Sequence, residues 1–348
     1  MIRIALVGCG RISKSHTAAI KELEKERQGH LVACCDIIAE RAQATAEAYG
    51  GGCRAFSNYA EMLKEIDCDL VALCTPSGLH PKHAIQAAEA GRHVLSEKPL
   101  GTSLQAVDEA IAACDEAGVH YLEVKQNRLN PTIILLRRAL EAGRFGRLHM
   151  ITSNVFWARP QDYYDMAPWR GTWEFDGGCL SNQAAHYVDM VQWMGGSVET
   201  VFGLSSTLGR RIEAEDTITV GLKFRNGAIG SINVSVLTYP NNLEGSITVM
   251  GEKGTVRIGG VAMNKIEQWH FADEDPMDAE VESASYDPKS VYGGGHYVLY
   301  RELPEFLKGK RTLLVPAREG RKTVEIIESA YKSPRTGGVT SITGRGSR

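Results

Sequence analysis

The sequence lacks the features of a membrane or nucleic-acid-binding protein. No run of about 18 apolar residues occurs anywhere in the chain, so no transmembrane helix is predicted. The formal net charge is only −3, which leaves no broad basic field for nucleic acid. Met1 leads directly into an apolar run without a signal sequence. We therefore expect a cytoplasmic protein with no membrane or nucleic-acid partner.

Several chemical signatures are also missing. There are eight cysteines but no Cys-x-x-Cys pair, and several lie inside apolar runs, so we expect reduced, buried thiols. His80 and His83 are three residues apart, but no further ligands complete a zinc spacing, and no metal is expected. The absence of Gly-x-Ser-x-Gly excludes the serine-hydrolase elbow.

The composition that remains is that of an ordinary globular protein. Hydrophobic residues make up 43% of the sequence and charged residues 23%. The length of 348 residues is enough for two domains. We predict a first domain over residues 1–124 and a second over 125–342, of which a C-terminal segment could pack back on the first. Residues 343–348 are small and basic and are typical of a vector-derived tail.

The start of the chain has the pattern of a dinucleotide site. An apolar run, Ile2–Val7, ends at a glycine turn, a helical pattern follows, and a second apolar run, Leu31–Cys35, ends at an acid. Gly8 permits the tight turn, and Gly10 lets the backbone approach a pyrophosphate at the helix N-terminus. Ser13 replaces the usual third glycine. This order predicts a Rossmann domain.

The acid after the second strand, Asp36, indicates which dinucleotide is bound. A carboxylate there accepts hydrogen bonds from both adenine-ribose hydroxyls and repels a 2′-phosphate. Ile37 and Ile38 follow, and the nearest cation, Arg41, is a turn further on. The sequence therefore favours NAD over NADP.

More strand–helix units follow, as in a parallel sheet with ligands at its carboxyl edge. The predicted elements are Asp69–Cys74, Pro81–Ala90, His93–Ser96, Leu104–Ala117 and His120–Val124. Lys98 follows a buried strand and precedes a proline. Its ammonium could hydrogen-bond a reacting hydroxyl, although a lysine in a loop is more often a solvated charge.

The rest of the chain predicts an α+β domain with a large, mostly antiparallel sheet. Pro131–Ala142 is a predicted helix and Arg147–Trp157 a predicted strand, and hairpin turns follow at Asn226-Gly227 and Glu252–Gly254. Further helices are expected at His296–Lys308 and Ala317–Tyr331. The fold class is thus α/β, a Rossmann domain plus an α+β domain. The open sheet face suggests a homo-oligomer, a tetramer or a dimer.

A helical stretch after Gly177-Gly178 carries a candidate base. Asn182, His186 and Asp189 would share one face at the spacing i, i+4 and i+7. A histidine on an internal face is more often a satisfied core group, but one with a fixed partner can act as a general base near neutral pH.

With these residues in view, the chain resembles the Gfo/Idh/MocA oxidoreductase family nearly end to end. The resemblance rests on the glycine turn Gly8–Ile12, Thr75-Pro76 through His80, Glu97-Lys98-Pro99, and Gly177 through His186. It implies that Lys98 and His186 flank the reacting carbon. The family's aspartate falls on Asn182, which cannot take a proton, so the base is His186 or Lys98, and the sequence leaves this open.

A closer resemblance rests on four further segments, Val124–Pro131, Arg159–Tyr164, Asn182-Gln183 and Tyr239–Gly245. These segments are similar to the family's sugar-nucleotide branch, which oxidises C3 of UDP-N-acetylglucosaminuronic acid (UDP-GlcNAcA), a precursor for surface polysaccharide. Cations for the diphosphate and carboxylate would come from Lys125, Arg128, Arg159 and Arg170, with Tyr163 or Tyr164 packing on uracil or sugar. The resemblance implies further substrate contacts from Lys98, Asn127, Asn182, His186 and Asn242. The NAD contacts it implies are Gly8, Gly10, Arg11, Ile12, Asp36, Thr75, Pro76, His80, Glu97, Lys98 and Gln126.

Two other functions fit the same motifs. A dehydrogenase or ketoreductase of a free sugar or inositol would need no diphosphate site. A non-catalytic dinucleotide sensor would keep the fold but would need neither Lys98 nor His186.

Overall fold

The computed structural model describes residues 1–287, 295–310, 312–336 and 338–342, so the predicted tail, 343–348, lies outside the described residues. The chain divides into two compact units. The first comprises Met1–Gln126 and the described residues of Gly294–Arg321, and the second comprises those of Asn127–Gly293 and Lys322–Arg348. The unit with the dinucleotide motif therefore includes a helix, α11 (Gly295–Leu307), from late in the chain.

The first unit is built on a seven-stranded sheet in the order β14-β6-β5-β4-β1-β2-β3. Its strands are β1 (Ile2–Val7), β2 (Gly29–Cys35), β3 (Arg54–Phe56), β4 (Leu70–Leu73), β5 (His93–Ser96), β6 (Tyr121–Glu123) and β14 (Val315–Pro316). All pair in parallel except β14, which is antiparallel to β6. Such parallel order brings the carboxyl ends of β1, β4 and β5 to one edge, where the predicted cofactor residues lie.

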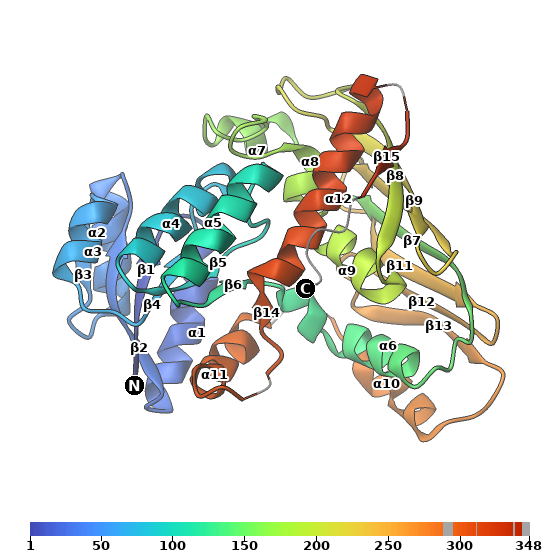
Figure 1. Ribbon diagram of the computed structural model, residues 1–348, viewed down its shortest axis with the longest axis horizontal. Coiled ribbons are helices and arrows are strands. Elements are labelled where there is room, and N and C mark those ends of the chain that lie inside the picture. Colours follow the sequence, from blue (N-terminus) through green and yellow to red (C-terminus); the bar gives the residue numbers. More distant parts are fainter. Residues whose placement is uncertain (288–294, 311, 337, 343–348) are drawn as a thin grey trace. The chain divides into compact units, whose positions relative to one another are not determined.

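Helices connect these strands, and those after β1, β4 and β5 agree with the sequence prediction. They are α1 (Ser13–Lys25), α2 (Ala39–Tyr49), α3 (Tyr59–Glu65), η1 (Ser77–Leu79), α4 (His80–Glu89) and α5 (Leu104–Glu116). Within the unit α1 packs against α11 and α4 against α5 (Figure 1). The strands β1, β4, β5 and β6 are largely buried, because a parallel sheet is covered on both faces.

The second unit is built on an eight-stranded sheet in the order β13-β12-β11-β7-β10-β9-β8-β15. The strands are β7 (Leu148–Phe156), β8 (Val198–Ser206), β9 (Thr217–Phe224), β10 (Ile229–Ser235), β11 (Glu244–Gly251), β12 (Gly254–Gly259), β13 (Lys265–Phe271) and β15 (Thr340–Ser341). Among the strands that the structure describes in this sheet, only β7 and β10 pair in parallel. The predicted mostly antiparallel sheet is confirmed.

One face of this sheet holds the core of the unit. Inward side chains such as Ile151, Val220 and Val249 belong to one buried cluster with side chains of α6 (Pro131–Glu141) and α9 (Ala185–Gly195). Figure 1 shows these two helices on one face of the sheet. The same unit contains η2 (Gln126–Leu129, which begins at the last residue of the first unit), α7 (Gln161–Asp165), α8 (Gly178–Asn182), η3 (Pro276–Glu280), α10 (Val281–Ala284) and most of α12 (Ala317–Thr336). On strands β8 and β10, Phe202, Leu204 and Ile229 are exposed.

The helical stretch after Gly177 differs from the sequence prediction. Two helices replace one, because the chain leaves α-helical geometry at Ala184 (φ −100°, ψ 3°). The Ala184 N–H donates to the Cys179 carbonyl, and the Ala184 carbonyl accepts the N–H groups of Tyr187 and Val188. Asn182 therefore ends α8 while His186 lies in the first turn of α9, so the expected shared face at i, i+4 and i+7 is wrong.

No helix among the described residues has both the length and the apolar character that crossing a bilayer requires.

Candidate active site

The glycine turn between β1 and α1 has two glycines with different roles. Gly8 has φ +95°, and a Cβ there would lie 2.6 Å from the Cys74 carbonyl group, so only glycine lets the ends of β1 and β4 approach this closely. A Cβ on Gly10 would meet nothing within 4 Å. No side chain caps the N-terminus of α1. The open space at Gly10 and this helix terminus fit a pyrophosphate.

Asp36, at the end of β2, braces the same turn. Its carboxylate accepts the Cys9 N–H at 2.8 Å and the Ile38 N–H at 2.9 Å. A carboxylate has about four acceptor positions, so these two bonds leave capacity for ribose hydroxyls. The neighbouring Ile37 is 92% exposed and so presents an apolar surface next to that position. The bracing role of Asp36 was not part of the sequence prediction.

His80 ties together the loops after β4 and β5. Its Nδ1 lies 2.8 Å from the Pro99 carbonyl oxygen and its Nε2 lies 2.8 Å from the Thr75 carbonyl oxygen. The ring is buried, and this burial lowers the pKa of His80 although both carbonyls oppose the shift. The sequence predicted a cofactor contact for His80, and the structure gives its ring nitrogens these two protein partners.

Glu97 is also directed into the protein. Its Oε1 accepts hydrogen bonds from His16 Nε2 at 3.0 Å and from His296 Nε2 at 3.2 Å, and its Oε2 accepts the Lys98 N–H at 3.2 Å. Burial opposes ionisation here, but the two imidazoles hold the pKa of Glu97 well below its ordinary value. Lys98 itself is half-buried. The predicted NAD contact of Glu97 thus stays a prediction, beside a structural role that the sequence did not reveal.

Other residues that the sequence predicts to contact cofactor (Arg11, Ile12, Thr75, Pro76 and Gln126) or substrate (Lys125 and Asn127) vary in exposure. Lys125 is buried, with its Nζ 3.1 Å from Glu123 Oε1. Arg11 is exposed, Ile12, Thr75 and Pro76 are half-buried, and Gln126 and Asn127 are buried.

In the second unit, Asn182 is held by a carboxylate. Its amide nitrogen donates to Asp176 Oδ1, while Asp176 Oδ2 accepts the Gly171 N–H at 2.7 Å. An amide bonded in this way orients its oxygen for another donor, which agrees with a positioning role. His186 is buried four residues past the end of α8.

Glu215 lies beneath α8 and was not among the predicted residues. Its Oε1 accepts the Leu180 N–H at 2.9 Å and the Tyr331 hydroxyl at 2.9 Å. Burial raises the pKa of Glu215 to about 7. A Cβ on Gly178, at φ +88°, would overlap the Glu215 carboxylate, which explains the second glycine of the pair. The adjacent acids Glu215 and Asp216 in a strand-rich region were the available signal.

Four of the predicted substrate residues lie together. The Arg159 guanidinium donates to Asn242 Oδ1 at 3.1 Å and lies 5.6 Å from the Tyr163 ring centre. The Arg170 guanidinium lies over the same Tyr163 ring, 4.3 Å from its centre. Two cations, an aromatic ring and an amide are a suitable set for a nucleotide diphosphate.

Arg128 has a different environment from these two cations. It forms a two-pronged ion pair with the buried Asp189, at 2.8 and 2.7 Å, and its guanidinium lies 4.6 Å over the Trp193 ring. This pairing connects η2 to α9. Its predicted contact with substrate stays a prediction, while its structural role is plain. Lys98 belongs to the first unit and His186 to the second.

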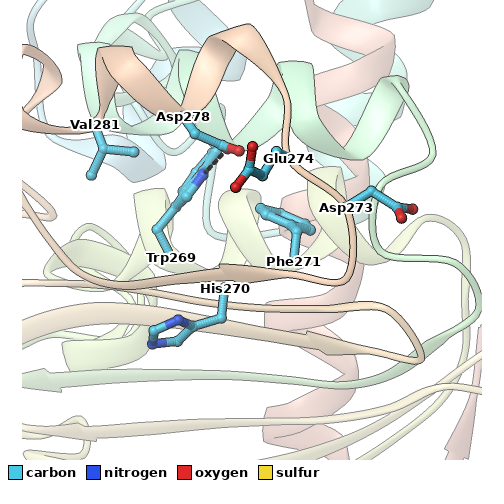
Figure 2. Close-up of a pocket in the computed structure, with 7 residues that line it drawn as sticks. All are labelled: Trp269, His270, Phe271, Asp273, Glu274, Asp278 and Val281. Atoms are coloured by element: carbon cyan, nitrogen blue, oxygen red, sulfur yellow. Dashed lines mark hydrogen bonds between the residues drawn. The ribbon is translucent and has the colours of Figure 1, made fainter.

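A surface hollow beside β13 contains none of the predicted site residues. Figure 2 shows its lining, which is Trp269, His270, Phe271, Asp273, Glu274, Asp278 and Val281. The Trp269 ring nitrogen donates to Asp278 at 2.6 Å. With three carboxylates and neither lysine nor arginine in its lining, this hollow is unsuited to a diphosphate.

Two family domains match the chain. Residues 2–125 match the domain described as oxidoreductase family, NAD-binding Rossmann fold, and residues 137–342 match the oxidoreductase family C-terminal alpha/beta domain. The predicted fold class and the predicted cofactor, NAD, are thereby confirmed.

Individual relatives agree with these matches. The WlbA dehydrogenase of Bordetella pertussis, crystallised with NADH and UDP-GlcNAcA, is 50% identical with a TM-score of 0.94, covering 98% of this chain and 97% of that one. The WlbA dehydrogenase of Chromobacterium violaceum, with the same two ligands, is 48% identical with a TM-score of 0.93, covering 99% and 96%. The myo-inositol 2-dehydrogenase of Thermotoga maritima is 30% identical, covering 73% and 74%.

Proposed function

The chain belongs to the Gfo/Idh/MocA oxidoreductase family, and from that premise we propose that it oxidises the C3 hydroxyl of UDP-GlcNAcA to a ketone with NAD. The observation that carries this proposal is the end-to-end likeness to the two WlbA dehydrogenases whose crystals hold NADH and UDP-GlcNAcA. The alternative, oxidation of a free polyol, rests on a more distant relative and leaves the cluster of Arg159 and Arg170 without a purpose.

The first unit would hold the cofactor. The turn at Gly8 and Gly10 and the N-terminus of α1 would take the pyrophosphate, and Asp36 the adenine ribose. When bound, NAD supplies a hydride acceptor. The exposed Ile37 would cover one face of the adenine, since it is apolar and adjacent to Asp36.

The chemistry requires one proton acceptor and one group that stabilises the developing alkoxide. The C3–H bond breaks as a hydride leaves for the nicotinamide, the O–H proton passes to a base, and the C3–O bond becomes a carbonyl. We assign the base to His186 or Lys98 and alkoxide stabilisation to Lys98. Asn182, held by Asp176, would orient the sugar without taking a proton.

The second unit would recognise the charged parts of the substrate. We assign the diphosphate and carboxylate chiefly to Arg159 and Arg170, with Tyr163 against the uracil or sugar and Asn242 holding Arg159. Asn127 and Lys125 would contribute from the segment that joins the two units. Arg128, paired with Asp189, would act by holding η2 in place.

The setting of the reaction is part of the same proposal. All eight cysteines are free thiols and seven are buried, which suits a reducing cytoplasm. The exposed apolar residues on β8 and β10 suit association of the sheets in a homotetramer or a dimer. The product would serve the synthesis of a diacetamido uronic acid for surface polysaccharide.

A substrate panel tests the proposal. The protein with NAD is mixed in single turnovers with UDP-GlcNAcA, UDP-GlcNAc and myo-inositol, and NADH formation is followed by absorbance. We expect reduction with the uronate and little with the other two, because only the uronate offers both charged groups. Reduction with myo-inositol alone would refute the nucleotide-sugar assignment while leaving the family and cofactor unchanged.

A further inference from the structure

We propose that three buried histidines, His16, His80 and His296, are positioning residues that clamp the Glu97-Lys98-Pro99 segment and so set the place of the Lys98 ammonium. The inference rests on the proposed function only in taking Lys98 as the catalytic lysine. All the residues of this histidine clamp belong to the first unit. They come from α1, α4 and α11, three helices far apart in sequence.

The first arm of the clamp holds the residue before Lys98. Glu97 follows β5 directly, and its backbone N–H donates to the Leu73 carbonyl at 2.9 Å. Its Oε1 accepts from both His16, at 3.0 Å, and His296, at 3.2 Å. Because its other oxygen accepts the Lys98 N–H, the two histidines are linked to the lysine backbone through one carboxylate.

Glu97 fixes which nitrogen of His16 carries the proton, and Tyr300 bonds the other nitrogen. A carboxylate only accepts hydrogen bonds, so His16 Nε2 must donate to Glu97. Burial lowers the pKa of His16, which keeps the ring neutral, and its Nδ1 therefore accepts the Tyr300 hydroxyl at 2.7 Å. Tyr300 and His296 both come from α11, so this late helix contributes two of the contacts.

The second arm holds the residue after Lys98. His80 Nδ1 lies 2.8 Å from the Pro99 carbonyl oxygen, and its Nε2 lies at the same distance from the Thr75 carbonyl oxygen. Both oxygens only accept hydrogen bonds, so a neutral ring donates to one of them and a protonated ring to both; in either form the buried ring lies between the loop after β5 and the loop after β4. With both neighbours of Lys98 held, the lysine side chain starts from a fixed backbone.

Such a clamp matters because lysine has a long, flexible stem. A misplacement of about 1 Å at a reacting group can cost on the order of 100-fold in rate. Fixing the backbone on both sides removes part of that freedom. A purely structural role for the three histidines would instead affect folding without a specific effect on Lys98.

The same atoms also have the composition of a metal site. One nitrogen from each of His16 and His296 and one Glu97 oxygen lie within 4.8 Å of one another. The hydrogen bonds account for this approach, since one carboxylate oxygen accepts two imidazole N–H groups. A bound metal would replace those protons, so the two arrangements give different results in the experiment below.

Matched substitutions at His296 test the clamp. Glutamine in His296→Gln can present an N–H near the position of Nε2, whereas leucine in His296→Leu cannot. His93→Leu is the control. His93 begins β5 at the end opposite to Glu97, and its Nδ1 accepts the His120 N–H at 3.0 Å. For each variant we would measure kcat, the Kd for NAD and the primary isotope effect with C3-deuterated substrate.

We expect His296→Leu to lower kcat about 10- to 100-fold with the Kd for NAD within about threefold of wild type. The isotope effect should rise because hydride transfer becomes slower than the other steps. His296→Gln should recover most of kcat, and His93→Leu should match wild type. Equal losses in the glutamine and leucine variants, or an unchanged kcat in His296→Leu, would overturn the clamp.

Two further measurements do not depend on the substrate. Lysines are reductively methylated with ¹³C, and the Lys98 signal is identified by its absence in Lys98→Arg. That signal should move in His296→Leu and stay in His93→Leu, whether or not UDP-GlcNAcA is a substrate. An unmoved signal refutes the clamp, and failure of the wild type to oxidise UDP-GlcNAcA refutes only the proposed function. Stoichiometric zinc in the wild type that is lost in His296→Leu would also overturn the clamp.

Discussion

At the scale of single residues, the two glycines of the turn after β1 have different roles: Gly8 is needed for folding and Gly10 for cofactor binding. Gly8 has a positive φ and touches the Cys74 backbone, whereas Gly10 faces open space. Gly8→Ala should therefore destabilise the first unit by about 2–4 kcal/mol, since strain and overlap add. Gly10→Ala should keep the stability of wild type but weaken NAD binding at least about tenfold, because the methyl group occupies the pyrophosphate position.

Thermal unfolding and NAD titration of the two variants check this pair. A Gly10→Ala protein that binds NAD as tightly as wild type would contradict the placement of the pyrophosphate.

Glu215 gives a prediction about pH. Its folded-state pKa of about 7 lies above the ordinary value of 4.5, so the folded protein keeps a proton that the unfolded chain releases. This stabilisation is complete below the ordinary pKa and is lost as the pH rises through about 7. Glu215→Gln imitates the protonated acid. The variant should therefore gain stability relative to wild type between about pH 5 and 8, by up to about 3 kcal/mol.

Denaturant unfolding of wild type and Glu215→Gln at about pH 5 and about pH 8 measures this difference in stability. A stability difference that does not change with pH would show that Glu215 does not titrate in this range.

At the scale of elements, two arginines that the sequence assigned to the same substrate have different environments. Arg128 pairs with buried Asp189 and connects η2 to α9, whereas Arg159 is half-buried beside Tyr163 and Asn242. Arg128→Met leaves a buried carboxylate without this partner, so we expect a loss of about 3–5 kcal/mol of stability. Arg159→Met should cost less than about 1 kcal/mol but raise KM for the nucleotide sugar at least about tenfold.

Unfolding curves and steady-state kinetics of these two variants provide the comparison. The opposite pattern, a stable Arg128→Met protein with a raised KM, would show that Arg128 binds substrate and is not needed for stability.

Also at the scale of elements, the parts that the sequence predicted are those with local signals. Alternating strands and helices, the glycine turn and hairpin turns such as Asn226-Gly227 all depend on neighbouring residues. The division of α8 from α9 at Ala184 was missed, because the helical period continues across it and only backbone hydrogen bonds reveal the break. The helices α2 and α3 and the short strand β3 between them were not predicted either.

At the scale of the whole molecule, what the sequence could not predict are contacts across long separations. Nothing near Glu97 indicates that His16 and His296 share its carboxylate, and nothing near Asp36 indicates that it holds the Cys9 N–H. Likewise, α11 is part of the compact unit that contains the glycine turn, although about 170 residues of the second unit intervene between its two segments. The family resemblance supplied the roles of Lys98 and His186, which residue type and spacing alone left open.

Transfer of a hydride from C3 of a UDP-linked uronate to NAD is the step on which the proposed function depends. The most direct measurement uses UDP-GlcNAcA deuterated at C3 with NAD in a single turnover, followed by mass spectrometry of the nicotinamide and the sugar. We expect deuterium in the reduced nicotinamide, a 3-keto sugar, and a rate at least about 1,000-fold lower in Lys98→Ala. Deuterium retained in the sugar, or near-normal turnover by Lys98→Ala, would contradict the proposed function.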